Sequence, residues 1–146
     1  MLSLSFTIRE ARPTDWHQIY ELYNSLPLED LYMRFFCLHR FSEEEAKRLV
    51  TLNDHVTIVV EVAGRIIGEG SLYNTGEFSL VVAPDFRGYG IGTEIVKTLI
   101  EKAKQLKMKK IFFYVLRDNI PMIRIGKKLG FKFIEEEGEL MGYLEL

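Results

Sequence analysis

One stretch near the middle of the chain restricts the possible folds more than any other. An apolar run ends at Val82, and a proline-containing turn with glycines at positions 88, 90 and 92 leads into a long segment of helical periodicity. Glycine lets the backbone adopt φ > 0 and approach a ligand closely, while the first N–H groups and the dipole of a helix attract an anion. A strand, a glycine turn and a helix in this order predict an α/β fold with an anion-binding loop.

Two familiar phosphate loops do not match this stretch. A dinucleotide-binding fingerprint needs Gly-x-Gly-x-x-Gly, but Thr93 stands three residues after Gly90. A nucleotide P-loop needs a Gly-Lys-Ser/Thr sequence after a four-residue gap, and none follows. The identity of the anion stays open at this point, and a glycine-rich turn without a ligand is the alternative.

Periodicity before this stretch changes from helical to alternating. Apolar side chains at helical spacing follow Pro13, and Ser42 with Glu45 forms a capping box for a later helix. Ala63-Gly64 is a turn signal between two β-branched runs, which predicts a hairpin. The predicted elements are a strand at 6–10, helices from 13, over 28–38 and over 42–52, and strands at 56–62, 66–73 and 77–82.

After the glycine loop, helices and strands alternate. The predicted elements are a helix over 90–106, a strand over 111–115, a helix from 121 to 129 and strands over 131–134 and 141–146. The run Ile111–Val115 is continuously apolar, which is typical of a strand buried on both faces. A right-handed crossover makes this strand parallel to 77–82. The sequence therefore predicts an α/β fold with a mixed, mostly antiparallel central sheet flanked by helices, as a single domain over residues 1–146.

Composition excludes several classes of protein. Cys37 is the only cysteine, so no internal disulfide forms, and the three histidines show no metal-ligand spacing beside it. No stretch has the length of a membrane span, and we expect a cytoplasmic protein without membrane or nucleic-acid binding. The charge is uneven, because residues 1–80 carry 7 basic and 12 acidic side chains and residues 81–146 carry 12 and 9. An anionic ligand is therefore favoured in the second part.

The pattern Arg87-x-x-Gly90-x-Gly92 after a strand resembles the pyrophosphate loop of the GNAT N-acetyltransferase superfamily. The opening TIREARPTD and the ending Asn119…Leu129-Gly130-Phe131 are similar to other signatures of that superfamily. The resemblance implies the GNAT (acyl-CoA N-acyltransferase) fold and acetyl-CoA as co-substrate, without a metal. The residues that it assigns to acetyl-CoA are Leu80, Val81, Val82, Arg87, Gly88, Tyr89, Gly90, Ile91, Gly92, Thr93 and Asn119.

A subgroup is also suggested by the sequence. Many superfamily members carry a tyrosine general acid five residues before the final phenylalanine, but here that position is Gly126. This absence, the segment Tyr32–Phe36 and Glu77 resemble the Pat-type protein lysine acetyltransferases. That resemblance implies acetyl transfer to the primary amine of a protein lysine. Targets in the group include acyl-CoA synthetases and a small basic chromatin protein.

Acetylation requires an unprotonated amine, whereas the ordinary pKa of a lysine side chain is about 10.4. We expect Glu77 to be the base that takes the proton, with Glu69 and Tyr73 in reserve. A solvated carboxylate at the start of a strand is the alternative for Glu77. For the whole protein, the alternatives are a small-molecule or N-terminal amine acetyltransferase and a non-catalytic acyl-CoA-sensing module.

Overall fold

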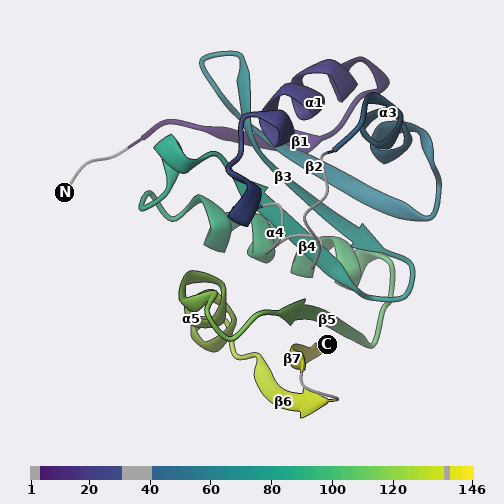
Figure 1. The fold of residues 1–146 in the computed structure, drawn as a ribbon. Helices are drawn as coiled ribbons and strands as arrows, with labels where there is room; N and C mark the ends of the chain where they lie inside the picture. The colour runs from purple at the N-terminus through teal and green to yellow at the C-terminus, as the bar shows by residue number, and fades with distance from the viewer. Residues whose placement is uncertain (1–3, 31–40, 137–138) are drawn as a thin grey trace.

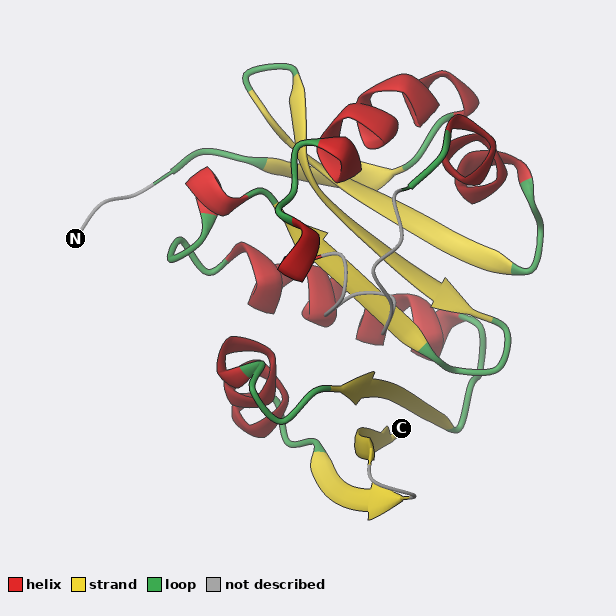
Figure 2. Cartoon of the chain, in the orientation of Figure 1, coloured by secondary structure: helices red, strands yellow, loops and turns green. Residues whose placement is uncertain are grey.

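The computed structural model describes residues 4–30, 41–136 and 139–146, and it confirms the α/β class (Figure 1 and Figure 2). Residues 28–30 of the helix predicted over 28–38 are described and helical, whereas Tyr32–Phe36 and Cys37 lie outside the described residues. The elements in chain order are β1 (Thr7–Glu10), a 3-10 turn (Pro13–Asp15), α1 (Trp16–Asn24), α3 (Glu43–Thr51), β2 (His55–Val62), β3 (Arg65–Tyr73), β4 (Phe78–Val82), a second 3-10 turn (Pro84–Phe86), α4 (Ile91–Gln105), β5 (Lys110–Val115), α5 (Ile120–Lys128), β6 (Lys132–Glu136) and β7 (Glu139–Glu145).

The first four strands form an antiparallel sheet in the order β1-β2-β3-β4. Helices α1 and α3 lie over one face of this sheet and α4 lies over the other (Figure 1). The hydroxyl of Tyr23 on α1 donates to the Glu69 carboxylate on β3. Gly70, the next residue, faces α4, where an added Cβ would lie 2.6 Å from Ile95 Cγ2. Successive residues of a strand point to opposite faces, so β3 contacts both helical layers.

The remaining strands form a smaller antiparallel sheet in the order β5-β7-β6. The prediction that the strand over 111–115 is buried on both faces is wrong. Ile111, Phe113 and Val115 are buried, but Phe112 and Tyr114 are only half-buried. The reason is that α4 and α5 cover one face of this short sheet, and no helix among the described residues covers the other (Figure 2).

Among the described residues, a single backbone bridge joins the two sheets. Glu77 and Phe112 form an isolated parallel bridge, in which the Phe112 amide donates to the Gly76 carbonyl over 3.0 Å. This bridge confirms that the strands before and after α4 run parallel. Beyond it β4 and β5 are hydrogen-bonded to different partners, β3 and β7. The chain therefore holds two parallel strands together at one end only.

Helix ends follow the predicted chemistry. The Ser42 hydroxyl accepts from the Glu45 amide over 3.1 Å, and the Glu45 carboxylate accepts from the Ser42 amide over 3.2 Å. This is the predicted capping box. Asn119 Oδ1 accepts from the Met122 amide at the start of α5. No helix in the described part of the chain has the length and apolar character that crossing a membrane requires.

Candidate active site

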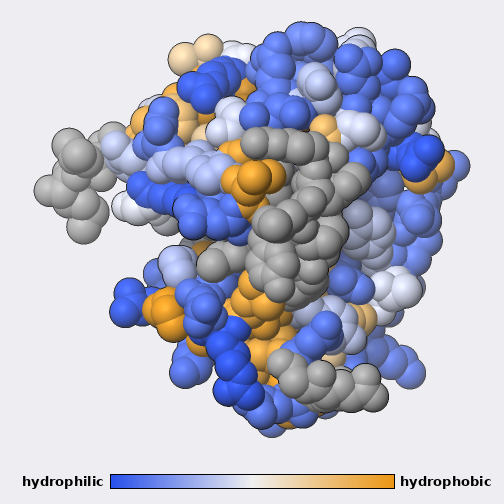
Figure 3. Space-filling model, in the orientation of Figure 1, coloured by the Kyte–Doolittle hydropathy of each residue, from blue (hydrophilic) through white to orange (hydrophobic). Residues whose placement is uncertain are grey.

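A cleft of about 700 Å³ opens where β4 and β5 part. Figure 3 shows the surface indented between α5 and the loop that follows β4. The cleft walls come from β4, the glycine loop, the start of α4, β5 and the start of α5. The described residues that line it are Glu29, Asp30, Phe78, Ser79, Leu80, Val81, Val82, Phe86, Arg87, Gly88, Gly90, Ile91, Gly92, Thr93, Phe113, Tyr114, Val115, Asp118, Asn119, Pro121, Met122 and Ile125. Ten of the eleven residues predicted to bind acetyl-CoA therefore line one cavity, and Tyr89 does not.

The glycine loop forms the anion-binding end of this cleft. Gly90 is the N-cap of α4 with φ +80°, and Gly88 has φ +86°. No heavy atom lies within 4 Å of a Cβ added at either glycine, so both α-carbons face open space. The first helical hydrogen bond runs from the Glu94 amide to the Gly90 carbonyl, which leaves the amides of residues 91–93 outside the helical ladder. The loop therefore fits a pyrophosphate group through backbone N–H groups and the helix dipole.

Gly92 has a second explanation that the sequence alone did not supply. It lines the cleft, but a Cβ added there would lie 2.9 Å from Ile125 Cδ1 on α5. That distance is shorter than normal van der Waals contact, so a side chain at this position would push the end of the Ile125 side chain aside. The glycine at this position therefore also eases the packing of α4 against α5.

The inner edge of β4 forms the apolar wall of the cleft. Leu80 and Val82 are half-buried, and Val81 is buried. The opposite edge of β4 pairs with β3, so its inner-edge backbone groups beyond Phe78 have no strand partner among the described residues. An extended chain with amide groups can bond to such an edge in the manner of an additional strand. This geometry fits the pantetheine arm of coenzyme A.

Arg87 and Asp30 form an ion pair at the mouth of the cleft. Arg87 Nη2 lies 3.1 Å from Asp30 Oδ2, and Arg87 Nε and Nη2 also donate to the Val82 carbonyl over 3.3 and 3.2 Å. The Arg87 side chain is 49% exposed and that of Asp30 is 18% exposed. The sequence pattern indicates Arg87 but not Asp30, because nothing in residues 28–30 points to contact with a loop almost sixty positions later.

Glu77 does not line the cleft, but it directly precedes Phe78, which does. It is half-buried, its carbonyl accepts from the Tyr73 amide over 2.8 Å, and its amide donates to the Thr75 hydroxyl over 3.3 Å. Tyr73 and Glu77 thus lie opposite each other at the two ends of the turn between β3 and β4. The structure places Glu77 where β4 and β5 begin to separate, rather than inside regular β4.

Glu69, the reserve base, belongs to a buried polar cluster beside the cleft. Its carboxylate is fully buried and accepts from the Tyr23 hydroxyl and, over 2.8 Å, from the Ser71 hydroxyl. The Ser71 hydroxyl in turn shares a 2.8 Å hydrogen bond with Thr57. A buried carboxylate is costly unless hydrogen bonds compensate it, and the hydroxyls of Tyr23 on α1 and Ser71 on β3 supply them here. Its buried position ranks Glu69 behind Glu77 as a base for an incoming amine.

The structure explains the glycine at the position of the missing tyrosine. Gly126 is buried in α5, and a Cβ there would lie 2.7 Å from Phe133 Cζ and 3.1 Å from Phe113 Cζ. Two phenylalanine rings therefore occupy the space that a side chain at position 126 would need. A tyrosine cannot be accommodated here without repacking β5 and β6 against α5.

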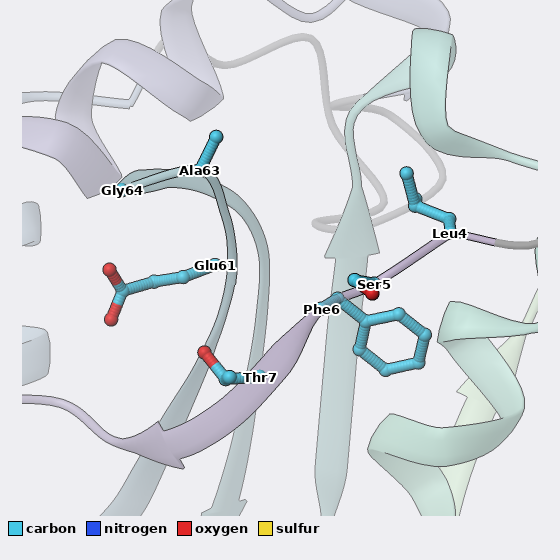
Figure 4. Close-up of a pocket in the computed structure, with 7 residues that line it drawn as sticks. All are labelled: Leu4, Ser5, Phe6, Thr7, Glu61, Ala63 and Gly64. Atoms are coloured by element: carbon cyan, nitrogen blue, oxygen red, sulfur yellow. The ribbon is translucent and has the colours of Figure 1, made fainter.

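A second cavity, of about 570 Å³, lies between the start of β1 and the β2–β3 turn (Figure 4). Thr7 and Glu61 extend to one side of β1, and Phe6 extends to the other. The Glu61 carboxylate already accepts from Arg9, which also binds Asp15 through Nη1 over 2.7 Å. The hydrogen bond from Arg9 holds the pKa of Asp15 below its ordinary value. These charged groups connect β1 to β2 and α1, so we assign them to folding.

Comparison with known proteins adds to this geometry. The model of the Acetyltransferase (GNAT) family matches residues 16–131. An N-alpha-acetyltransferase of Sulfurisphaera tokodaii is 28% identical over an alignment of 147 residues. The match covers 89% of this chain and 82% of that protein. The GNAT domain of S. lividans PAT superposes with a TM-score of 0.86 at 19% identity, over 95% of this chain and 89% of that domain. The structure of yncA from Salmonella typhimurium, solved with its cofactor acetyl-CoA, gives a TM-score of 0.77 at 23% identity, over 97% of this chain and 94% of that chain.

Proposed function

The chain belongs to the GNAT acetyltransferase family and is an acetyl-CoA-dependent N-acetyltransferase, and we propose that its acceptor is a lysine side chain on a folded protein. The observation that carries the site assignment is the cleft between β4 and β5, with the glycine loop at its mouth and Glu77 directly before the lining residue Phe78. We also propose that residues 1–146 act as one domain, which the hydrophobic core shared by both sheets supports.

We assign acetyl-CoA binding to two parts of the cleft. The amides of Gly88 to Thr93 and the Arg87 guanidinium would hold the pyrophosphate, and the inner edge of Leu80–Val82 would bond the pantetheine amides. Asn119 would add its side-chain amide while its Oδ1 caps α5, because an amide group has donors to spare. Tyr89 is half-buried outside the cleft lining, so its contribution would be through the loop backbone.

Acetyl-CoA supplies an activated acyl group, and the chain has to supply an unprotonated amine and a fixed geometry. We propose that Glu77 accepts a proton from the acceptor ammonium, either directly or through one water. Its half-buried position next to the cleft lets it approach the acceptor while remaining partly desolvated. A backbone N–H of the β4 edge facing the cleft would then stabilise negative charge on the acetyl oxygen.

The lysine acceptor is supported by the Pat-type features and by charge. Gly126 stands where a tyrosine general acid is common, and the acidic side chains of residues 1–80 outnumber the basic ones by five. A negatively charged surface speeds the approach of a lysine-rich partner and sets a salt dependence. An acyl-CoA synthetase or a small basic chromatin protein has the required exposed lysines.

A second candidate acceptor is the α-amine of a protein N-terminus. The relative from Sulfurisphaera tokodaii, an N-alpha-acetyltransferase, favours it, because the match extends over most of both chains. The two acceptors differ in basicity, since an α-amine has a pKa of about 8 and a lysine about 10.4. An enzyme for α-amines therefore depends less on a base at neutral pH.

The test measures acetylation of lysine-rich proteins with radiolabelled acetyl-CoA and locates the modified amine by mass spectrometry. Glu77→Gln should lower turnover on the order of 10²- to 10⁴-fold and leave the affinity for acetyl-CoA unchanged. Glu101→Gln, which changes an exposed carboxylate on α4, is the matched control and should behave as the wild type. Wild-type turnover in Glu77→Gln would exclude Glu77 as the base. Modification of α-amines alone would replace the lysine proposal by the second candidate.

A further inference from the structure

The cleft carries an unexpected charge for a site that receives an anion. Among the described residues that line it, the acidic side chains are Glu29, Asp30 and Asp118, and the basic one is Arg87. The lining therefore has a formal charge of −2, while the pyrophosphate of coenzyme A is itself an anion. Attraction has to come from backbone N–H groups, the α4 dipole and Arg87 alone. The acidic groups need an explanation other than ligand attraction.

Asp30 is the acidic group that touches the cation. Its Oδ2 lies 3.1 Å from Arg87 Nη2, and no other described residue approaches the Arg87 guanidinium with a carboxylate. The same Oδ2 atom is buried and has no hydrogen-bond partner among the described residues. A buried carboxylate oxygen that makes an ion pair but no hydrogen bond is held weakly, because its desolvation is only partly compensated. The contact is therefore easy to exchange for a better one.

Arg87 offers what a pyrophosphate oxygen needs. Its guanidinium has five N–H donors, and here Nε and Nη2 donate to the Val82 carbonyl at the end of β4. This places the cation at the mouth of the cleft, beside the loop glycines. The carboxylate of Asp30 occupies one side of the same guanidinium group. Two anions cannot both be close to one cation in this space without repelling each other.

From this arrangement we propose that Asp30 is an internal competitor of the coenzyme A pyrophosphate for Arg87. The inference rests on the proposed function, because it takes Arg87 as a pyrophosphate contact. Asp30 neutralises Arg87 when the nucleotide is not bound and is displaced from it when the nucleotide binds. The exchange lowers the affinity for acetyl-CoA and for the product CoA alike. A site with such a counter-ion releases its product faster, at the expense of binding strength.

The proposal separates Asp30 from Glu29, which precedes it. Glu29 lines the same wall and is exposed, but it has no ion pair with Arg87. Asp30→Asn keeps the shape of the side chain and removes the charge, whereas Glu29→Gln removes a neighbouring charge without freeing the arginine. Glu29→Gln therefore controls for the general effect of making the cleft less acidic.

The experiment measures the dissociation constants of acetyl-CoA and of S-acetylpantetheine, which lacks the pyrophosphate, by calorimetry. Asp30→Asn should tighten acetyl-CoA binding about fivefold, the order of one screened charge pair at contact, and leave S-acetylpantetheine binding unchanged. Glu29→Gln should change acetyl-CoA affinity less than Asp30→Asn. In an Arg87→Gln background, Asp30→Asn should have no effect. Thermal unfolding of each variant checks that the fold is retained.

Several results would overturn the proposal. Unchanged or weaker acetyl-CoA binding by Asp30→Asn would show that Asp30 orients Arg87 rather than competing for it. If Glu29→Gln raised the acetyl-CoA affinity as much as Asp30→Asn, or if Asp30→Asn still raised it in the Arg87→Gln background, the effect would come from the general charge of the cleft. Equal tightening of S-acetylpantetheine would place the effect away from the pyrophosphate. If the wild-type chain bound no acetyl-CoA, the assigned function itself would fail, which is distinct from all of these results.

Discussion

Gly90 and Gly64 offer an unusually direct test of the glycine loop. Both are exposed, their φ angles are +80° and +81°, and no heavy atom lies within 4 Å of a Cβ added to either. They differ in location, since Gly90 caps α4 inside the cleft and Gly64 lies in the turn between β2 and β3. Replacing either glycine by alanine therefore adds the same backbone strain, but only the replacement at Gly90 alters the cleft.

The expected stability effects are equal. An alanine in the left-handed region costs about 1 kcal/mol relative to glycine. A loss of 1 kcal/mol lowers the Tm of a domain of this size by about 3 °C. Gly64→Ala and Gly90→Ala should therefore unfold at similar temperatures, both slightly below the wild type, when no ligand is added.

The expected binding effects differ. The methyl group of Gly90→Ala projects into the open space where the pyrophosphate would approach the loop amides. Loss of one hydrogen bond to a charged group is worth about 1.5–3 kcal/mol, which raises the Kd about tenfold to a hundredfold. Gly64→Ala should keep the wild-type Kd. Calorimetry with acetyl-CoA measures both values, and equal Kd values for the two variants would refute the pyrophosphate assignment of this loop.

Three further predictions concern stability and acceptor choice. The hydrogen bond from Arg9 lowers the pKa of Asp15 below its ordinary 3.8 in the folded state. The ionised Asp15 therefore stabilises the fold above pH 3.8, and this stabilisation is lost as the pH falls through the lower pKa of the folded state. Arg9→Gln should thus cost on the order of 2 kcal/mol at pH 7. Denaturant titrations should show the difference in unfolding free energy from the wild type narrowing as the pH falls below 3.8. Tyr23→Phe removes a donor from the buried Glu69 carboxylate and should cost about 1–3 kcal/mol. Tyr20→Phe on the same helix, whose half-buried hydroxyl has no hydrogen bond among the described residues, should cost less in the same titration. For the acceptor, an intact lysine-rich protein should be acetylated faster than a peptide around its modified lysine, because the rest of the protein surface supplies binding energy outside the lysine. Rising salt should reduce this difference in acetylation rate, because it screens the charges on the two surfaces.

Local signals in the sequence were sufficient for most of the elements. The Ser42–Glu45 capping box, the Ala63-Gly64 turn and the cap at Asn119 all depend on residues within a few positions of one another, and the structure confirms each. The glycine loop belongs to the same kind of signal, since its φ angles and the helix behind it are set locally. Such patterns carry their own physical cause, so a single sequence is enough to predict them.

Contacts between distant segments were not accessible in this way. The Asp30–Arg87 ion pair and the Tyr23–Glu69 hydrogen bond join residues 57 and 46 positions apart. Neither has a local pattern, although an acidic residue between two glycines, as Glu69 is on β3, is unusual in a buried strand and indicates a buried polar role. The exposure of one face of β5 depended on which helices cover the second sheet. That is a property of tertiary packing, which periodicity along one strand does not encode.

The single bridge between Glu77 and Phe112 has a consequence for the protein before it meets its substrate. A strand edge without a partner strand is a template on which another chain can add, and the cleft-facing edges of β4 and β5 lack a partner strand among the described residues. We expect backbone amides along these edges to exchange their hydrogens with water faster than amides between β2 and β3, which the ladder protects. Acetyl-CoA would then act as a temporary strand, and the cellular supply of that metabolite would decide how long these edges remain exposed to proteases and to other copies of the chain.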